Sequence, residues 1–302
     1  MTLKIQRLLA RAKKNTKKGD IDAAKDDYLS ILKFMPNNQE AKNQLSKLSK
    51  NKPTSPTQSQ LDLIIKLYSS NQIQDALNSL DSLINNYPYD PSLFNIRGAC
   101  FKAINKIESA VESFKNAINI KPDYAEAHFN LALTLKELNK FNEAIKYYEM
   151  AISIKPAYPI AHNNLGLIFL ELNQLDFAAK HFNWAILYNL EFAEAHNNLG
   201  TTLQQSRQFN ASIKHYLKAT TINPYFTQAF NNLGIIHQTL GQQIKAIKYF
   251  QKAISLDPNY TSAYFNLSRI KTFLPEDIQI SQMQSLLTNN CLLYTSPSPR
   301  DS

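Results

Sequence analysis

Five asparagines recur at a constant interval of 34 residues, and each is followed by Leu and then by a small residue. They are Asn130, Asn164, Asn198, Asn232 and Asn266. A fixed period of this length indicates a stack of repeated units, because one short helical hairpin cannot bury its apolar face alone. The chain is therefore expected to fold as a linear array rather than as globular domains.

Two more phases of the repeat predict how paired helices pack. A small residue recurs at one phase, at Gly98, Ala132, Gly166, Gly200, Gly234 and Ser268. A second small residue follows at Ala76, Ala110, Ala144, Ala178, Ser212 and Ala246, with a bulky residue four positions later at Leu80, Phe114, Tyr148, Phe182, Tyr216 and Phe250. Residues four apart share a helix face, so the bulky side chains are expected to fill the space that the small ones leave.

Prolines punctuate the array, as at Pro122, Pro156 and Pro224, where they would end the second helix of a unit. Together these phases resemble the tetratricopeptide repeat (TPR) family. The resemblance covers roughly residues 57 to 260 as six units, with a seventh first helix from Tyr260 to about Phe273. It implies an all-α fold, a right-handed superhelical solenoid of antiparallel helix pairs.

The spacings predict five segments. Ala12, Gly19, Ala24, Tyr28 and Pro36 carry the repeat pattern in a different register, followed by a helix from Gln39 to Ser49 and a Pro/Ser/Thr stretch. We therefore expect a degenerate unit plus an extra helix at 1–50, a linker at 51–57, six units at 58–260, a seventh first helix and a junction helix at 261–290, and a non-native tail at 291–302.

Charge and cysteine content narrow the function classes. Residues 1–56 hold 13 Lys and Arg against 5 Asp and Glu, which leaves 20 against 19 for the rest, so the array is nearly neutral overall. The basic amino-terminal segment is either a binding surface for nucleic acid or anionic lipid or a solvated helix face, and we expect the second.

The two cysteines do not indicate a disulfide framework, and Cys100 is expected to be buried. Without a signal peptide or long apolar run, the chain is expected to be soluble and cytoplasmic, with no membrane contact.

Catalytic and cofactor motifs are not found in the sequence. The six glycines all fall at repeat phases, so none is left for a phosphate-binding loop. His128, His162 and His196 share one phase, but equivalent residues on neighbouring units should lie about 10 Å apart, too far for one metal ion. His181 and His215 are expected to pack between helices, and Trp184 to lie in the core. We expect no enzyme activity, cofactor or metal in this chain.

The asparagines point to binding instead. An asparagine side chain has both a donor and an acceptor, so it can hold the main chain of an extended peptide. This pattern resembles the asparagine ladder of the O-linked N-acetylglucosamine transferases, which implies that Asn130, Asn164, Asn198, Asn232 and Asn266 hold a protein substrate in a concave groove. Asn163, Asn197 and Asn231 precede ladder members and are expected to widen the polar strip, whereas Ile96 at the ladder phase should end it. The alternative is that these side chains only link neighbouring helices.

The end of the array raises a second function. Arg269, Ile270, Phe273, Glu276, Asp277, Met283, Leu286 and Leu287 resemble the junction that leads to the catalytic domain of bacterial TPR-sulfotransferases. Cys291–Ser302 resembles a translated sequencing adapter.

Taken together, the repeats and the asparagines predict a protein-interaction module that binds an extended peptide and does not bind nucleic acid. The alternatives are the substrate-recruiting half of a truncated transferase, sulfotransferase before glycosyltransferase, and a structural scaffold; the ligand and oligomeric state stay open.

Overall fold

The computed structural model describes residues 2–18, 20–35, 38–50, 55–272 and 278–282. Within these ranges the regular structure is entirely α-helical, and no strand is found, so the expected all-α class is confirmed. The chain divides into two compact units, residues 1–105 and 106–302, and each is described by itself. No helix in the described ranges combines the length and apolarity needed to cross a bilayer.

The first three helices pack around a small core of their own. They are α1 (Thr2–Lys18), α2 (Ile21–Phe34) and α3 (Gln39–Lys50). Ala12 and Ala24 are fully buried against Tyr28, as the spacing of the degenerate unit predicts, whereas Gly19 and Pro36 lie outside the described residues. Arg11 donates two 2.9 Å hydrogen bonds to the Asp27 carboxylate, which joins α1 to α2.

The next three helices are α4 (Gln58–Ser69), α5 (Ile73–Asn86) and α6 (Pro91–Ala103). Thr57 begins α4 with a capping box, because its hydroxyl accepts from the Gln60 amide while the Gln60 side chain accepts from the Thr57 amide. Ala76 and Leu80 are fully buried with Cys100, so the small and bulky phases meet here as expected. Burial without a charged partner raises the pKa of the Cys100 thiol to about 11.

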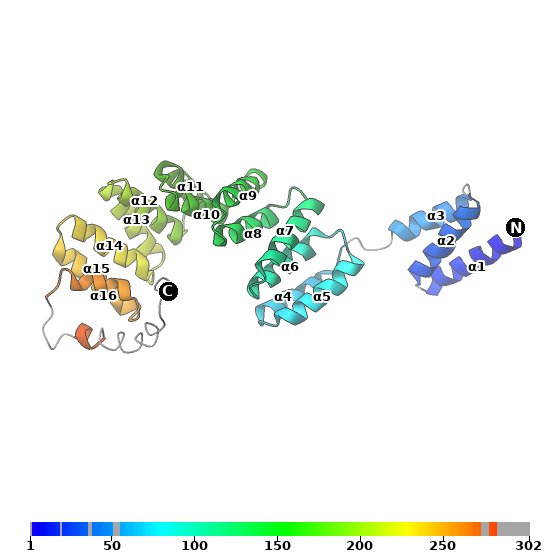
Figure 1. The fold of residues 1–302 in the computed structure, drawn as a ribbon, viewed down its shortest axis with the longest axis horizontal. Helices are drawn as coiled ribbons and strands as arrows, with labels where there is room; N and C mark the ends of the chain where they lie inside the picture. The colour runs from blue at the N-terminus through cyan, green and yellow to red at the C-terminus, as the bar shows by residue number, and fades with distance from the viewer. Residues whose placement is uncertain (1, 19, 36–37, 51–54, 273–277, 283–302) are drawn as a thin grey trace, which may run out of the picture. The chain divides into compact units, whose positions relative to one another are not determined.

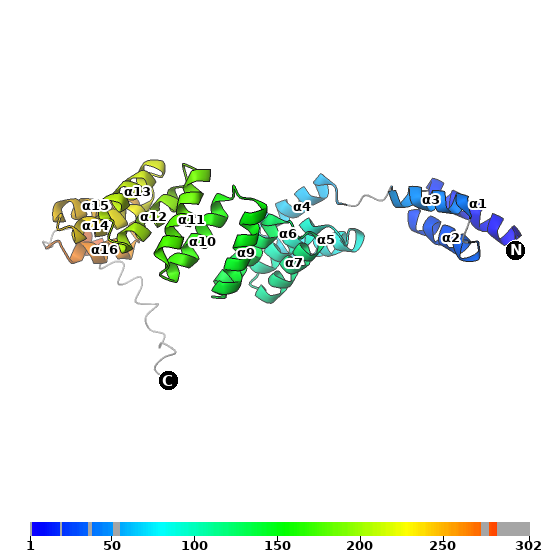
Figure 2. The ribbon, with the colours of Figure 1, turned by 90° about the horizontal axis from the view of Figure 1, so that it is seen from above.

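The second unit is a run of helices that pack in chain order (Figures 1 and 2). Its members are α7 (Ile107–Ile120), α8 (Ala125–Glu137), α9 (Phe141–Ile154), α10 (Pro159–Glu171), α11 (Leu175–Tyr188), α12 (Ala193–Gln205), α13 (Phe209–Ile222), α14 (Thr227–Thr239), α15 (Gln243–Leu256) and α16 (Thr261–Ser268). We call α8–α9, α10–α11, α12–α13 and α14–α15 repeats 3 to 6. In each repeat the even-numbered helix comes first and packs antiparallel to the second.

The glycine phase sets how closely the two helices of a repeat approach. A Cβ atom added to Gly166, Gly200 or Gly234 would lie 2.7, 2.7 and 2.4 Å from the ring of Phe182, Tyr216 and Phe250, respectively. These distances are far below carbon–carbon contact, so the aromatic ring occupies the place of the missing side chain. The expectation that bulky residues fill the space left by small ones is confirmed.

The turn between the two helices of a repeat is built in the same way each time. One residue there takes a left-handed backbone conformation, with φ between 56° and 71°, at Asn71, Asn105, Asn139, Asn173, Arg207 and Gly241. Asparagine and glycine tolerate this region best. Gly241 is thus a turn glycine, and Arg207 is the exception among the turns of the described residues.

Candidate functional site

The ladder asparagines lie on the first helices of successive repeats, and hydrogen bonds connect three of them to the repeat before. The Nδ2 group of Asn198 donates to Oδ1 of Asn163 at 3.0 Å. Asn232 donates to Asn197 at 3.0 Å, and Asn266 donates to Asn231 at 3.1 Å. Each bond spans 35 residues and links α10 to α12, α12 to α14 or α14 to α16. We call these three bonds the amide relay.

The relay needs an asparagine immediately before the ladder position of the preceding repeat. Phe129 stands at that place in repeat 3, so Asn164 has no relay acceptor there, and its Nδ2 group donates to the Ile160 carbonyl of its own helix at 2.9 Å. Asn130 is half-buried, and its carbonyl accepts from the Thr134 hydroxyl at 2.8 Å. The ladder is therefore periodic in sequence but not uniform in its hydrogen bonds.

The relay separates the asparagines into two roles. Asn163, Asn197 and Asn231 are only 7%, 2% and 4% exposed, so they act as buried acceptors between repeats and do not widen an open polar strip as we expected from the sequence. Asn198, Asn232 and Asn266 are half-buried. Their Oδ1 atoms accept no hydrogen bond from the described residues and are not among the buried unsatisfied atoms, so they stay open to solvent.

A hollow of about 440 Å³ lies beside the last of these amides. Asn266 and Phe265 of α16 line one side, and Asn231 and Ile235 of α14 line the other. Tyr260, which precedes α16, and Thr261 and Ser262 at its start complete the lining. The lining thus combines amides with apolar surface and carries no charged side chain. Such a site suits a neutral extended chain better than a carboxylate, since no cation lines it.

The histidines of the shared phase pair with histidines of the second helix. Nδ1 of His162 lies 3.2 Å from Nδ1 of His181, and Nδ1 of His196 lies 3.0 Å from Nδ1 of His215. Nε2 of His162 lies 3.2 Å from the Pro156 carbonyl and must donate to it. The neutral ring of His162 therefore accepts at Nδ1, and His181 supplies the proton. The expectation that His181 and His215 pack between helices is confirmed.

These paired rings are held neutral. Burial, together with the nearby His162 and Lys180, lowers the pKa of His181 to about 4. Burial also lowers the pKa of His162, His196 and His215. Two facing nitrogens hold one proton between them, so protonating both rings would place two donors in contact. Among the described residues, no group of three His, Cys, Asp or Glu side chains is placed to hold a metal ion.

Trp184 differs from its expected place in the core. It is 38% exposed and stacks on His162 and Tyr188 with ring centroids 6.2 and 5.8 Å apart. The bulky core phase of that repeat belongs to Phe182, which is fully buried. Trp184 stands two residues further along α11 and so points to a different side of the helix.

The segment after α16 is described only in part. Tyr264 donates to Oε1 of Gln282 at 3.1 Å, and Lys271 donates to Gln279 at 3.3 Å, so residues 278–282 fold back onto the last repeat helix. Arg269 lies over the ring of Phe265 at 5.9 Å. Most of the residues that resemble a sulfotransferase junction, and the whole of the adapter-like tail, lie outside the described residues.

The fold and the site define an all-α repeat protein whose first helices present a row of amides. Family profiles described as TPR repeat match residues 100–138 and 133–173, and profiles described as tetratricopeptide repeat match 193–226 and 227–260. The chain therefore contains TPR repeats, and its fold is the TPR solenoid. No curated protein matched the sequence.

Solved TPR structures share this fold at low sequence identity. YrrB, described as a TPR protein with an unusual peptide-binding site, is 19% identical with a TM-score of 0.53, and the match covers 62% of this chain and 96% of YrrB. The pilF protein of Pseudomonas aeruginosa is 14% identical with a TM-score of 0.63 and coverages of 70% and 96%. PilW, a type IV pilus biogenesis factor, is 20% identical with a TM-score of 0.61 and coverages of 72% and 100%. At these identities the likeness concerns the fold alone.

Proposed function

We propose that the chain is a protein-interaction module that binds an extended peptide along the ladder from Asn164 to Asn266. TPR arrays act as scaffolds for protein and peptide partners, and the fold is consistent with that role. The observation that carries the proposal is the amide relay. In the relay, the Nδ2 group of each of three ladder asparagines donates one hydrogen bond to the preceding repeat, while the side-chain oxygen Oδ1 of the same asparagine stays open to solvent.

Pre-organisation is what the relay adds to binding. A free asparagine side chain loses rotamer freedom when it grips a ligand, and this entropy opposes binding. Asn198 and Asn232 are already fixed by 3.0 Å bonds, so the loss has occurred on folding. Repeats lie about 10 Å apart, and an extended chain rises about 3.3 Å per residue. Successive ladder amides would therefore contact peptide residues that are about three positions apart. Recognition of this kind reads the peptide main chain.

The test compares ladder and non-ladder asparagines. Peptides selected from a random displayed library on the wild-type chain are measured by fluorescence anisotropy against Asn164→Ala and against Asn198→Ala with Asn232→Ala. The double variant should bind about thirtyfold more weakly, because it loses two hydrogen bonds that are worth about 1 kcal/mol each. Asn142→Ala with Asn210→Ala, which alters exposed positions on second helices, is the matched control.

Asn164 separates ligand contact from structural support. Its Nδ2 group bonds within its own helix, so Asn164→Ala leaves the relay intact. Weaker peptide binding by Asn164→Ala, with an unchanged unfolding curve, supports direct contact. Equal affinities for wild type and all ladder variants would refute the proposal and leave the asparagines as links between helices.

The transferase alternative predicts a different result. A recruiting domain would present the same ladder to a substrate for a following catalytic domain, and its sequence support lies largely outside the described residues. Open-reading-frame sequence beyond Asn290 distinguishes it, since a sulfate-donor loop there would favour the alternative. Peptide binding by the array is expected in both cases.

A further inference from the structure

Repeats 5 and 6 carry an unbalanced positive charge that the near-neutral total conceals. Between Glu194 and Asp257 the sequence holds six Arg and Lys residues and no Asp or Glu. Five are lysines on the second helices α13 and α15, and all five are exposed: Lys214, Lys218, Lys245, Lys248 and Lys252. None forms an ion pair within the part of the chain that the structure describes. We call these five lysines the basic face.

The phase of Lys214 and Lys248 also holds lysine in repeats 3 and 4, at Lys146 and Lys180, so repeats 5 and 6 differ from them at the other phases and in their lack of acids. Lys218 and Lys252 occupy the phase held by Met150 and Trp184 in repeats 3 and 4. Second helices of those repeats also contain acids, Glu143 and Glu149 in α9 and Asp176 in α11, whereas α13 and α15 contain none. The excess of positive charge on α13 and α15 is thus a local departure from the repeat pattern, and the packing of the helices does not require it because these lysines are exposed.

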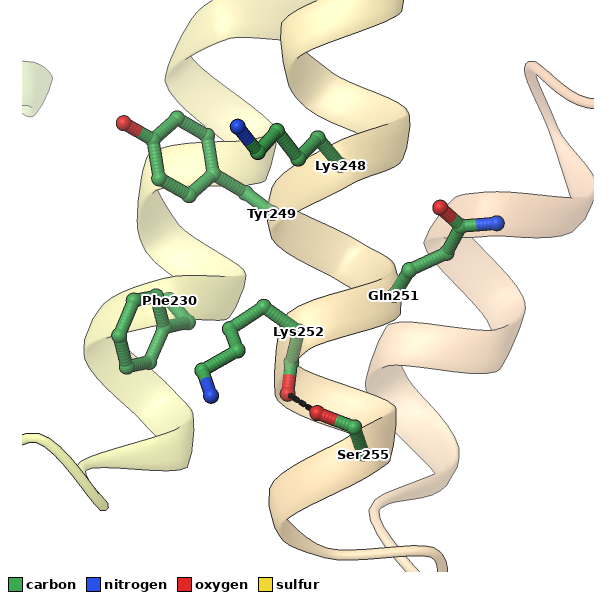
Figure 3. Close-up of a pocket in the computed structure, with 6 residues that line it drawn as sticks. All are labelled: Phe230, Lys248, Tyr249, Gln251, Lys252 and Ser255. Atoms are coloured by element: carbon green, nitrogen blue, oxygen red, sulfur yellow. Dashed lines mark hydrogen bonds between the residues drawn. The ribbon is translucent and has the colours of Figure 1, made fainter.

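A hollow of about 470 Å³ opens on the basic face. Figure 3 shows Lys248, Tyr249 and Lys252 on the side of α15 that faces α14, with Lys252 beside Phe230, while Gln251 points to the other side of the helix. Nζ of Lys252 lies 5.9 Å from the centroid of the Phe230 ring, and the rings of Phe230 and Tyr249 give the recess its apolar surface. Amines at the rim and rings at the floor make one composite site. It shares no lining residue with the hollow beside Asn266.

We propose that the basic face binds an acidic peptide segment of a partner protein, whose apolar or aromatic side chain enters the hollow at Phe230 and Tyr249. Charge complementarity selects the partner, because uncompensated lysines attract carboxylates and steer their approach. Lys214 and Lys248 share a phase on successive repeats, about 10 Å apart, which corresponds to about three extended residues. Acidic residues at that spacing would reach both repeats.

Two features favour a protein segment over nucleic acid or lipid. Bidentate recognition of phosphate favours the planar fork of arginine, whereas the basic face consists of lysines alone, with Arg207 placed in a turn at φ 57°. The apolar part of the site is a recess rather than a protruding edge, so it admits a single side chain and does not insert into a bilayer. Both other classes remain outcomes of the experiment.

The test uses defined probes on the whole chain. A fluorescein-labelled peptide of Glu and Asp residues with one central Phe is measured by anisotropy, beside a twin with Gln and Asn for the acids and a twin with Gly for Phe. The basic-face variant carries Lys214→Gln, Lys218→Gln, Lys248→Gln and Lys252→Gln. The control loses the same charge at exposed lysines elsewhere, through Lys106→Gln, Lys115→Gln, Lys140→Gln and Lys146→Gln.

The acidic Phe peptide should bind wild type and control equally and the basic-face variant about tenfold more weakly, with affinity falling as salt is raised. Both twins should bind more weakly than the parent peptide. Equal losses in variant and control, or no preference for the acidic peptide, would overturn the proposal. The proposal would also be overturned if a single-stranded oligonucleotide or phosphatidylserine vesicles bound to the same lysines more tightly than the acidic Phe peptide does. Asn198→Ala should leave this binding unchanged, so failure here is distinct from failure of the ladder.

Discussion

Gly234→Ala is the sharpest test of how the helices of a repeat pack. An added Cβ would lie 2.4 Å from Cε1 and 2.5 Å from Cδ1 of Phe250, whose side chain is fully buried. Carbon atoms pack best at about 3.5–4.0 Å, so the ring must retreat by about 1 Å. Overpacking of this kind lowers the free energy of unfolding by about 1–3 kcal/mol, and the better helix propensity of alanine offsets about 1 kcal/mol of that loss. We expect a net loss of about 1 kcal/mol in the free energy of unfolding.

The measurement is urea denaturation followed by circular dichroism and by Trp184 fluorescence, because repeat arrays can unfold unit by unit and one probe would hide it. Phe250→Leu in the Gly234→Ala background should recover part of the loss, giving a favourable coupling of about 0.5–1 kcal/mol in a double-mutant cycle. Ala132→Gly, at the same phase in repeat 3, is the control for propensity and should cost about 1 kcal/mol. A Gly234→Ala chain more stable than wild type would refute the packing argument.

Three further outcomes are expected. Arg207→Gly should stabilise the chain by about 0.5–1 kcal/mol, because φ is 57° there and a glycine avoids the left-handed strain; an unchanged denaturation midpoint contradicts this. Stability should fall by about 1–2 kcal/mol as the pH drops from about 6.5 toward about 4, because histidine in the unfolded chain takes up a proton in this range, whereas folded His181, with its pKa lowered to about 4, stays neutral. The His181 side chain is only half-buried, which reduces the effect. Above about pH 6.5 the full stability is present. The double variant His162→Phe with His181→Tyr, which copies the Phe230–Tyr249 pair of repeat 6, should show a smaller drop in melting temperature as the pH is lowered. In a Cys291→Ser background, Cys100 should react with a disulfide reagent only on unfolding, because it is fully buried and its pKa is raised to about 11; rapid native-state labelling would show that the α5–α6 core opens.

Much of the fold was readable from residue spacing. Small and bulky residues at fixed phases predicted the close approach of Gly166 to Phe182, because a helix places residues four apart on one face whatever surrounds it. The turn asparagines Asn139 and Asn173 also recur at the repeat period, and their tolerance of positive φ is the sequence signal for the turns. The lack of acids between Glu194 and Asp257 was likewise visible in the sequence but hidden in a total charge.

The candidate site was predicted only in outline. The period placed Asn198 and Asn232 at equivalent positions, and it could not say which neighbour each amide would meet. Asn163 and Asn197 were expected to share an open strip, and instead they are buried acceptors from the next repeat. Trp184 was assigned to the core by its nearness to the bulky phase, and it is 38% exposed.

The sequence by itself determined the repeat, its helix pairs and the identity of the residues that face one another within a pair, because these depend on local helix geometry. Only the tertiary structure decided which asparagines are open and which are buried, because a bond from Asn232 to Asn197 crosses between repeats. Its existence depends on the rotation and distance between successive first helices, and a period in the sequence carries no information about either.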